Sequence, residues 1–572
     1  MTLILGIHTG NHDSAACLFE DYELLAAVAQ ERLTRSKGDG GRVPVEAMDE
    51  CLTIAGRSRA DVDVVALGRS FFPERYCRSS VFTRFTTLPV RRALGRERNR
   101  YLLTECRRHG TTDTLSVFDA GRFLSDHELG ADTKITFTNH HLAHALPCLF
   151  HTDWDEALLF TADGTGDNAQ YSVRLFGEGR LETLDGGDEA VLLPKRVDSL
   201  GEAYSYATEA LGFVRFRDEG KLTGLAARGE PVFFEALAAH FRVDDEGYIG
   251  SDFAGYAQMK RRVAELVRST TRENASASIQ RVLETVLLES IGRLLQRHPR
   301  RFLGLSGGVF ANVRLNQRLA EELPLDELMV FPAMGDQGQP YGAALAYLLE
   351  RDGLPRWLEQ RRRLESLYCG RDFGDAIDHR LAADPAFERV STESVRTSAE
   401  LLHAGRVVAL YTRGMEYGPR ALGARSILAA AVDPGIGDVL NARLSRNDFM
   451  PFAPVVLADD AEAVFELGPR TRYAARFMTV ACAVREPWRA RIPAVVHVDG
   501  TARPQIIERR HNALYYDITA AYKALSGVPV LVNTSFNAHE EPIINTPDEC
   551  ARALARDRVD FVVTDRAVYG RK

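Results

Sequence analysis

Two histidines spaced four residues apart are the strongest chemical signal in this sequence. They lie in Asn139-His-His-Leu-Ala-His144, so on a helix His140 and His144 project from one face and can bind one metal ion. Asp163 and Asp336 each follow an apolar run in a glycine-flanked turn and can supply oxygen ligands. Two histidines with carboxylates favour Fe(II), Mn or Zn over a metal that prefers thiolates. Packing or capping of a helix is the alternative role of the pair.

The sequence around this pair also argues against one common zinc chemistry. The residue after His140 is another His, where a zinc metalloprotease carries its general-base Glu, so peptidase activity is disfavoured. A separate candidate base is His12, which lies beside Asp13 in the first polar turn. An imidazole near neutral pKa could take a proton from an acceptor hydroxyl. Both residues are also ordinary turn residues, so a structural role stays open.

Two glycine-rich segments are suited to phosphate or nucleoside contact. The stretch 218–229 surrounds the single Lys221 with three glycines, which permits close backbone approach to a phosphate, although it is not a Walker loop. The stretch from Ser306 to Asn312 offers backbone N–H groups at a helix start and an amide for a base or ribose.

Three motifs late in the chain predict an anion site. Residues 417–425 present two arginines around a rigid turn, which suits bidentate binding of phosphate. Residues 499–504 and 533–537 add Arg, Asn and Ser beside strand-like runs, with hydrogen-bonding capacity for a carboxamide. By contrast, we interpret the arginine-rich segment 75–108 mainly as a solvated helix face, with contact to an acceptor or to nucleic acid as the alternative.

The elements that must position these residues have the pattern of an α/β protein. Residues 3–7 form an apolar strand followed by a polar turn and a second apolar run, and residues 157–176 repeat that plan. Two facing strand–turn–strand units are how the actin, sugar-kinase and heat-shock ATPase superfamily holds a nucleotide. Helical spacing covers 256–299 and 313–322, and residues 302–310 read as strand, glycine turn and helix start.

Chain length and charge limit the number of domains and the kind of binding partner. The chain has 572 residues, and a single core stops growing near ~250–300 residues, so at least two domains are expected. A charged stretch over 351–365 places a boundary near 355–370, and strand-like runs at 406–411, 528–532 and 559–563 predict a second α/β domain. A net charge of −8 makes nucleic acid an improbable partner, which favours small-molecule chemistry.

Cysteine usage and hydropathy point to a cytoplasmic protein. The 8 cysteines are scattered without a Cys-x-x-Cys pair, which suits reduced thiols and argues against disulfide scaffolds and zinc ribbons. No run approaches the ~20 apolar residues of a membrane span, so we expect no membrane association. The oligomeric state is not predicted.

Taken together, these segments resemble the O-carbamoyltransferases typified by the nodulation-factor, cephamycin and tobramycin carbamoylating enzymes. The matching stretches are residues 12–16, 31–35, 139–145, 163–167, 220–229, 307–312, 335–336, 418–426, 451–454, 497–503 and 533–542. They follow the family order over almost the whole chain. One departure is Met450, which replaces the Arg that many relatives carry before Pro-Phe-Ala-Pro.

The resemblance implies a fold and a reaction. Residues 1–360 would form a duplicated actin/sugar-kinase-like domain similar to the tRNA threonylcarbamoyl transferases, and residues 361–572 a YrdC-like α/β domain. The YrdC-like domain would make carbamoyladenylate from carbamoyl phosphate and ATP with Mg²⁺. The N-terminal domain, with an Fe(II)-type centre, would transfer the carbamoyl group to a hydroxyl of a natural product, as in antibiotic biosynthesis. The alternatives are a tRNA threonylcarbamoyl transferase and a non-catalytic nucleotide-binding protein.

The resemblance also implies roles for individual residues. The metal ligands would be His140, His144, Asp163 and Asp336, the catalytic residues His12 and Asp13, and the nucleotide contacts Gly164, Lys221, Gly224, Gly307, Gly308 and Asn312. The contacts to carbamoyl phosphate or its adenylate would be Arg420, Arg446, Arg503, Asn533 and Ser535.

Overall fold

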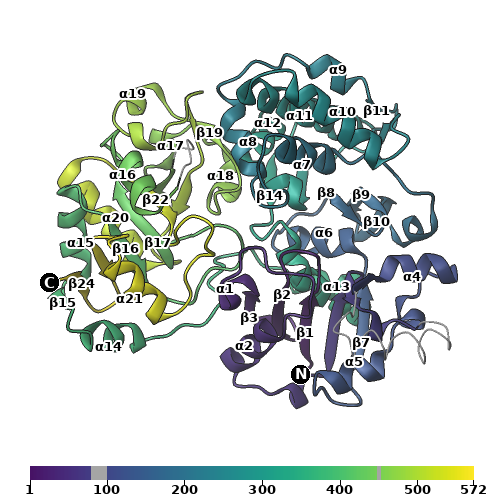
Figure 1. Ribbon diagram of the computed structural model, residues 1–572, viewed down its shortest axis with the longest axis horizontal. Helices are drawn as coiled ribbons and strands as arrows, with labels where there is room; N and C mark the ends of the chain where they lie inside the picture. Colours follow the sequence, from purple (N-terminus) through teal and green to yellow (C-terminus); the bar gives the residue numbers. More distant parts are fainter. Residues whose placement is uncertain (79–98, 447–451) are drawn as a thin grey trace.

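The computed structural model describes residues 1–78, 99–446 and 452–572 (Figure 1). The central part of the arginine-rich segment, with Arg91, Arg92, Arg96 and Arg98, lies outside these residues, as do Met450 and Pro451. The interpretation of that segment as a solvated helix face therefore stays a prediction.

The N-terminal sheet places the first polar turn beside the centre of the molecule. Its strands are β1 (Leu3–His8), β2 (Ala15–Glu20), β3 (Glu23–Ala29), β4 (Val64–Gly68) and β7 (Lys134–Thr138). They lie in the order β3-β2-β1-β4-β7, in which β1 pairs antiparallel with β2 and parallel with β4. Because alternate side chains of β1 point to opposite faces, Ile4 joins one apolar cluster and Leu5 joins another.

A second sheet repeats this plan. Its strands are β8 (Ala157–Gly166), β9 (Ala169–Gly177), β10 (Arg180–Asp185), β13 (Phe302–Ser306) and β14 (Glu327–Val330). The order β10-β9-β8-β13-β14 is equivalent to that of the first sheet, again with an antiparallel and a parallel neighbour for the central strand. The duplicated actin/sugar-kinase-like architecture expected from the sequence is confirmed.

Two helices occupy the space between the sheets. Helix α6 (His140–Phe150) packs on β8 and β13, helix α13 (Gln339–Glu359) packs on β1 and β4, and the two helices pack on each other. The Asn139 side chain caps α6 by accepting the N–H of Leu142, which fixes the first turn where the two histidines lie. The predicted helix carrying His140 and His144 is therefore present.

The C-terminal part forms one larger mixed sheet. Its strands are β15 (Phe387–Ser391), β16 (Val408–Tyr411), β17 (Arg425–Ala430), β18 (Ala453–Leu457), β21 (Gln505–Ile507), β22 (Val530–Ser535), β23 (Phe561–Val563) and β24 (Val568–Arg571). They lie in the order β15-β24-β23-β16-β17-β22-β18-β21. This is the second α/β domain that the sequence predicts, of the class expected for a YrdC-like domain, and the three strand-like runs correspond to β16, β22 and β23.

The other elements surround these sheets. In the N-terminal part they are α1 (Glu31–Thr34), α2 (Val45–Ala55), β5 (Phe71–Pro73), β6 (Asn99–Tyr101), α4 (Leu102–His109), α5 (Ala120–Asp126), α7 (Leu200–Ala210), α8 (Glu219–Ala226), α9 (Phe234–Ala238), β11 (Phe241–Val243), β12 (Ile249–Ser251), α10 (Tyr256–Arg268), α11 (Arg272–Arg297) and α12 (Val313–Glu322). In the C-terminal part they are α14 (Ala376–Ala382), α15 (Ser394–His403), α16 (Ile436–Arg443), α17 (Ala461–Val464), α18 (Pro469–Ala475), β19 (Cys482–Ala483), α19 (Glu486–Arg489), β20 (Thr501–Ala502), α20 (Ala513–Ser526) and α21 (Pro547–Ala555). The helical spacing over 256–299 and 313–322 is confirmed by α10, α11 and α12.

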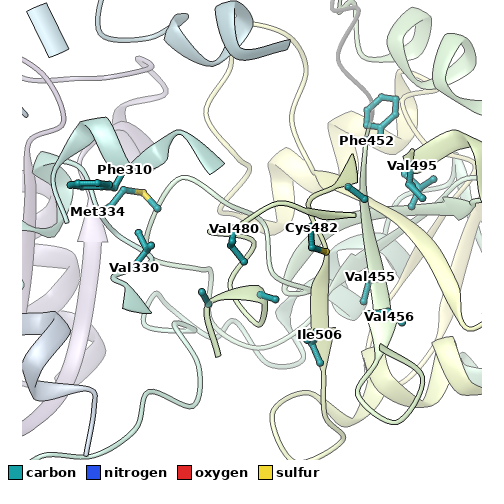
Figure 2. Close-up of a cluster of buried hydrophobic side chains, with 14 of the residues drawn as sticks. Phe310, Val330, Met334, Phe452, Val455, Val456, Val480, Cys482, Val495 and Ile506 are labelled. Carbon is teal, nitrogen blue, oxygen red and sulfur yellow. The ribbon is translucent and has the colours of Figure 1, made fainter. Parts of the chain in front are cut away.

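One apolar cluster runs from the second sheet into the C-terminal sheet. Figure 2 shows Phe310 and Met334 on one side, Val480 between, and Val455 and Ile506 of the C-terminal sheet on the other. Polar contacts follow the same border, since the N–H of Ala481 donates to the Val313 carbonyl at 3.1 Å. The two parts therefore share a core where they meet. None of the helices in the described ranges is long and apolar enough to cross a membrane.

Candidate active site

Four side chains meet where the two N-terminal sheets face each other. One ligand atom from each of His140, His144, Asp163 and Asp336 lies within 4.8 Å of all the others. The His144 Nε2 atom is 3.1 Å from Asp163 Oδ2 and 3.4 Å from Asp336 Oδ1, and His140 Nε2 is 3.6 Å from Asp163 Oδ2. The structure thus brings together all four residues that the sequence proposed as metal ligands.

Local backbone explains how the four groups converge. The two histidines begin α6, Asp163 lies in the outer part of β8, and Asp336 opens the short helical turn before α13. The imidazole of His140 lies directly on Gly166, where a Cβ atom would be 2.1 Å from His140 Cδ2. The carbonyl of His140 also accepts a hydrogen bond from the Gln339 side chain at 3.1 Å. Position 166 therefore admits only glycine while the ring keeps this place.

The donor set fits a divalent metal ion. His140 Nε2 and Asp336 Oδ1 are buried and have no hydrogen-bond partner among the described residues, an arrangement that costs ~1–3 kcal/mol per group unless a ligand satisfies them. Two imidazole nitrogens with two carboxylates suit Fe(II), Mn or Zn. The four residues at this cluster would hold the ion.

Proton affinities in the cluster show how strongly it attracts a cation. Burial lowers the pKa of His144, but the hydrogen bond with Asp163 and the nearby Asp163 and Asp336 carboxylates outweigh it and raise that pKa to about 9. Burial and the Asp336 charge raise the pKa of Asp163, yet the two imidazoles outweigh them and bring it below its usual range. The site thus binds a proton tightly where a metal ion would replace it.

The histidine between the two ligands has a different role. His141 Nε2 donates to the Ala169 carbonyl at 3.1 Å, and its Nδ1 accepts from Thr161 Oγ1 at 2.8 Å. Full burial, reinforced by the neighbouring His140, lowers the pKa of His141 well below its ordinary value. This imidazole is therefore neutral and orients α6 instead of binding a ligand.

The candidate base lies at the mouth of the same site. His12 Nδ1 is 3.0 Å from Asp13 Oδ2, and the imidazole stacks on the Phe216 ring with centroids 4.9 Å apart. Burial lowers the pKa of His12, but the Asp13 hydrogen bond and surrounding carboxylates outweigh it and raise the pKa to about 9. The positive φ of 57° at Asp13 belongs to the tight turn that presents both side chains.

A cavity of about 420 Å³ opens above these groups and reaches the C-terminal part. The sequence-predicted residues that line it are His12, Asp13, Asp163, Gly164, Gly308, Asn312, Asp336, Arg420 and Ser535. Residues from both parts of the chain thus face one space. Other lining residues include Glu31, Arg32 and Asn537, which lie in matched stretches but were given no individual role, and Lys37, Phe216 and Arg217, which no sequence motif included.

The turn that carries Arg420 is built around a buried carboxylate. Glu416 Oε1 accepts the N–H groups of Leu422, Ala424 and Arg425, which closes the loop and leaves Arg420 facing the cavity. The sequence suggested that both arginines of this turn bind phosphate, but Arg425 is fully buried and lies 3.7 Å from the centre of the Tyr411 ring. Only Arg420 faces the ligand space.

A second cavity of about 320 Å³ lies on the other side of α8 and contains Arg503 and Gly224. Thr223 lines both cavities, so the two spaces adjoin. Burial lowers the pKa of Arg420 to about 10, and burial together with the Arg420 charge lowers the pKa of Arg503 well below its ordinary value. In the described part of the chain no carboxylate pairs with either guanidinium. Positive charge that no carboxylate compensates is what an anion-binding site requires.

The remaining predicted anion-site residues lie around the end of β22. Arg446 donates to Thr534 Oγ1 at 2.8 Å and to Ser535 Oγ at 3.1 Å, which places it beside Ser535 despite the altered motif that follows it. Asn533 is buried in the sheet, where its amide donates to Gln505 Oε1 at 2.7 Å, while its own oxygen has no partner among the described residues.

Of the predicted nucleotide-binding residues, Gly164, Gly308 and Asn312 line the larger cavity and Gly224 lines the smaller one, whereas Lys221 and Gly307 line neither. The Lys221 ammonium lies 3.3 Å from Asp218 and faces neither cavity, although its neighbours in α8 do. Gly307 supplies backbone with φ 101°, and a Cβ there would be 2.1 Å from the Ala162 carbonyl oxygen. Asn312 caps α12 and pairs with Gln280 at 2.8 Å, so its amide is already engaged.

Three cationic residues of the large cavity had no individual signal in the sequence. Arg32 is almost fully buried and donates to the Gly418 carbonyl at 2.8 Å, so it joins the first helix to the Arg420 turn. Burial lowers the pKa of Lys37. Arg217 forms an ion pair with Glu540 at 2.7 Å across the two parts of the chain. Only tertiary structure brings these residues together.

Comparison with known proteins follows the same division of the chain. The family description "Carbamoyltransferase N-terminus" matches residues 3–81 and 120–345, and "Carbamoyltransferase C-terminus" matches 399–571. Nodulation protein NolNO of Sinorhizobium fredii is 31% identical over 575 residues, which cover 97% of this chain and 78% of that protein. Nodulation protein NolO of Bradyrhizobium diazoefficiens is 33% identical over 443 residues, covering 74% and 77%.

Among solved structures, full-length HypF in its phosphate- and nucleotide-bound form is 16% identical, with a TM-score of 0.32, over 62% of this chain and 56% of that one. The sequence matches cover both parts of the chain that form the large cavity. They confirm the resemblance found in the sequence motifs. The chain belongs to the carbamoyltransferase family of enzymes.

Proposed function

We propose that this enzyme is an ATP-dependent O-carbamoyltransferase that uses carbamoyl phosphate and acts on a hydroxyl group of a small natural product. Carbamoyladenylate forms on the C-terminal part, residues 361–572, and the carbamoyl group is transferred on the N-terminal part, residues 1–360. A role in antibiotic biosynthesis and a place in the cytoplasm belong to the same proposal.

The observation that carries the proposal is the composition of the shared cavity. One wall holds a compact set of carboxylates and imidazoles that attracts a cation, and the other holds Arg420, whose guanidinium pairs with no carboxylate among the described residues. Arg503, in the adjoining smaller cavity, likewise pairs with no carboxylate in the described ranges. A ligand that carries a phosphate and a polar carbonyl group would meet the guanidinium wall with its phosphate. Its carbonyl would then face the cluster. Carbamoyladenylate has this combination of groups.

The first step places negative charge near Arg420, Arg503 and Arg446. Water cleaves carbamoyl phosphate to carbamate and inorganic phosphate, and the carbamate oxygen then attacks the α-phosphorus of Mg²⁺-ATP, which releases pyrophosphate. The guanidinium groups would bind the phosphates throughout, and their partial burial strengthens each interaction because less water screens it than at the surface. Ser535, which lines the larger cavity at the end of β22, would add its hydroxyl beside them.

The second step requires a hydroxyl to be deprotonated and a carbonyl to be polarised. A divalent ion held by His140, His144, Asp163 and Asp336 would supply Lewis acidity toward the carbamoyl carbonyl. In its neutral form His12 would take the hydroxyl proton, and Asp13, at 3.0 Å, orients the imidazole and stabilises its charged form. Asp13 and, to a smaller extent, the Asp336 and Asp163 charges raise the pKa of His12, so a cation held by these two carboxylates would lower that pKa toward neutrality. The new C–O bond forms at the carbamoyl carbon as the bond to AMP breaks, so AMP leaves with the electron pair.

The adjoining cavities suit a reactive intermediate. Carbamate and carbamoyladenylate both decompose in water, so a short enclosed route favours transfer over loss. Thr223 borders both spaces, and Arg420 and Arg503 are close enough for their charges to interact. We propose that ATP and carbamoyl phosphate enter through the smaller cavity and that the acceptor enters through the larger one.

The direct test is to incubate the purified protein with carbamoyl phosphate, ATP and Mg²⁺ without an acceptor. Mass spectrometry should detect carbamoyladenylate, and pyrophosphate should form with it. Their absence from protein that binds both metal and nucleotide would overturn the proposed first step. A panel of hydroxylated acceptors then identifies the second substrate. Exchange of segment 75–108 with that of a relative should change acceptor preference, and an unchanged preference would remove that segment from acceptor recognition.

A further inference from the structure

The region that separates the two matched halves of the N-terminal family description has contacts of its own. The match stops at residue 81 and resumes at 120, so residues 82–119, here called the unmatched segment, lie outside it. Its described part, 99–119, contains β6, α4 and a short helical turn over Thr114–Val117. Strand β6 pairs with β5, where the Tyr101 ring stacks on Phe71 with centroids 4.8 Å apart.

Two side chains of the unmatched segment connect to Asp167, the residue whose carboxylate accepts the first N–H of α6. The Tyr101 hydroxyl accepts the backbone N–H of Asp167 at 3.0 Å. The Thr114 hydroxyl accepts the Nε–H of Arg69 at 2.8 Å, and Arg69 donates through Nη1 to Asp167 Oδ2 at 2.9 Å. That same carboxylate oxygen accepts the backbone N–H of His140 at 2.9 Å. Tyr101 is thus separated from a proposed metal ligand by one residue, Asp167, and Thr114 by two, Arg69 and Asp167.

The energetics make Asp167 dependent on these partners. Its side chain is 0% exposed, and its second carboxylate oxygen has no hydrogen-bond partner among the described residues. A buried carboxylate is stable only when charge and hydrogen bonds compensate for its lost hydration. Arg69 supplies the charge, and Tyr101 satisfies the N–H group of the Asp167 backbone, which has φ 50°. Loss of either contact would let Asp167 shift.

We propose that Tyr101 and Thr114 are positioning residues for the candidate metal centre, acting on His140 through Asp167 and Arg69. This inference rests on the metal centre of the proposed function. Asp167 holds the first N–H of α6, and the His140 ring has little freedom because it lies against Gly166. A small movement of Asp167 would therefore displace the His140 imidazole from the position it needs to share an ion with His144. Groups that hydrogen-bond directly to a metal ligand, as Asp167 does to His140, typically change metal affinity 10–100-fold, so Tyr101, one residue further away, should act at the lower end of that range.

The test is Co²⁺ binding to the full-length protein. Titration gives the affinity, and the visible d–d spectrum reports the geometry of the bound ion. Tyr101→Phe removes only the hydroxyl, and Thr114→Val removes the acceptor of Arg69 with little change in volume. Tyr76→Phe is the matched control, because the Tyr76 hydroxyl is also buried and bonded, to Asp126 at 3.1 Å and His127 at 3.2 Å, but does not contact α6. Thermal unfolding of the ion-free proteins measures any general loss of stability.

We expect Tyr101→Phe to weaken Co²⁺ binding on the order of 10-fold and to shift the d–d bands, while Tyr76→Phe leaves both unchanged at equal or greater loss of stability. Thr114→Val should act in the same direction. Wild-type binding of one Co²⁺ with no difference between the tyrosine variants would overturn the inference and leave the proposed function standing. Failure of the wild-type protein to bind Co²⁺ would overturn both.

Discussion

Replacing Arg503 by Met should make the ligand-free protein more stable and at the same time remove its first reaction. The variant keeps most of the apolar stem that packs in the smaller cavity but loses the guanidinium. Arg503 and Arg420 are two half-buried cations, the Arg420 charge lowers the pKa of Arg503, and no carboxylate pairs with either in the described residues. The ligand-free fold therefore contains a repulsion that only a bound anion relieves.

The magnitude follows from Coulomb's law. For a separation on the order of 10 Å and an effective dielectric constant of ~20, two like charges repel by roughly 1–2 kcal/mol, and solvent screening of the half-buried groups makes this an upper bound on the free energy of unfolding that the Met variant should gain. With ligand present, the substitution is unfavourable instead, because the bound anion loses its charged partner. Loss of a buried charged partner costs ~2–5 kcal/mol, which at 1.36 kcal/mol per tenfold corresponds to a decrease of roughly 30- to 5000-fold in carbamoyladenylate formation.

Two measurements on one preparation test this prediction. Urea denaturation without ligand gives the free energy of unfolding, and pyrophosphate release with carbamoyl phosphate and ATP gives the rate. Arg509→Met is the matched control, because Arg509 is exposed and pairs with Asp517 at 2.8 Å. It should change neither the rate nor, beyond a few tenths of a kcal/mol, the stability.

Two outcomes would refute the reasoning. If Arg503→Met lowers stability in the absence of ligand, the side chain has a compensating partner and is structural. If the variant is more stable but makes carbamoyladenylate at the wild-type rate, the smaller cavity is not where the anion binds.

The metal cluster and the base lead to three further predictions. His144→Ala should lose the divalent ion and carbamoyl transfer but still release pyrophosphate, and equal loss of both steps would contradict the division of labour. In ion-free protein, NMR titration should place the pKa of His12 near the value of about 9 set by Asp13, and Asp13→Asn should lower it. Because that pKa exceeds the ordinary 6.5, the charged ring stabilises the fold below pH 6.5, and this contribution is lost as pH rises through about 9. Gly166→Ala should reduce Co²⁺ affinity and destabilise the protein by ~1–3 kcal/mol, because its Cβ would overlap the His140 ring; wild-type affinity would show that the ring can move.

Much of the fold could be read from local pattern. Apolar runs ended by Gly and Asp turns predicted β1, β8 and β13, because strands buried on both faces are continuously hydrophobic. The repeated strand–turn–strand plan predicted the duplication. The four proposed metal ligands could be predicted for the same reason, since each lies at a strand end or helix start whose position follows from the sheet.

The cationic wall of the large cavity was harder to predict. Arg32, Lys37 and Arg217 come from short helices and loops, and they meet the cavity only because the two parts of the chain pack together. Residue type also misled at Arg425, which has the same local sequence signal as Arg420 but stacks inside the domain on Tyr411. The path of the loop decides which arginine faces the cavity and which is buried. Glu416 fixes that path by accepting three backbone N–H groups, and no sequence pattern predicted this role.

The apolar cluster shared by the second sheet and the C-terminal sheet limits how this protein can be engineered. Separating the chain near residue 360 would expose Phe310 and Met334 on one fragment and Val455 and Ile506 on the other (Figure 2). Fragments expressed alone should therefore aggregate, and chimaeras that join halves from different relatives will need matched side chains along this border. Changes of acceptor are better sought in the residues around the cavity than by exchanging whole domains.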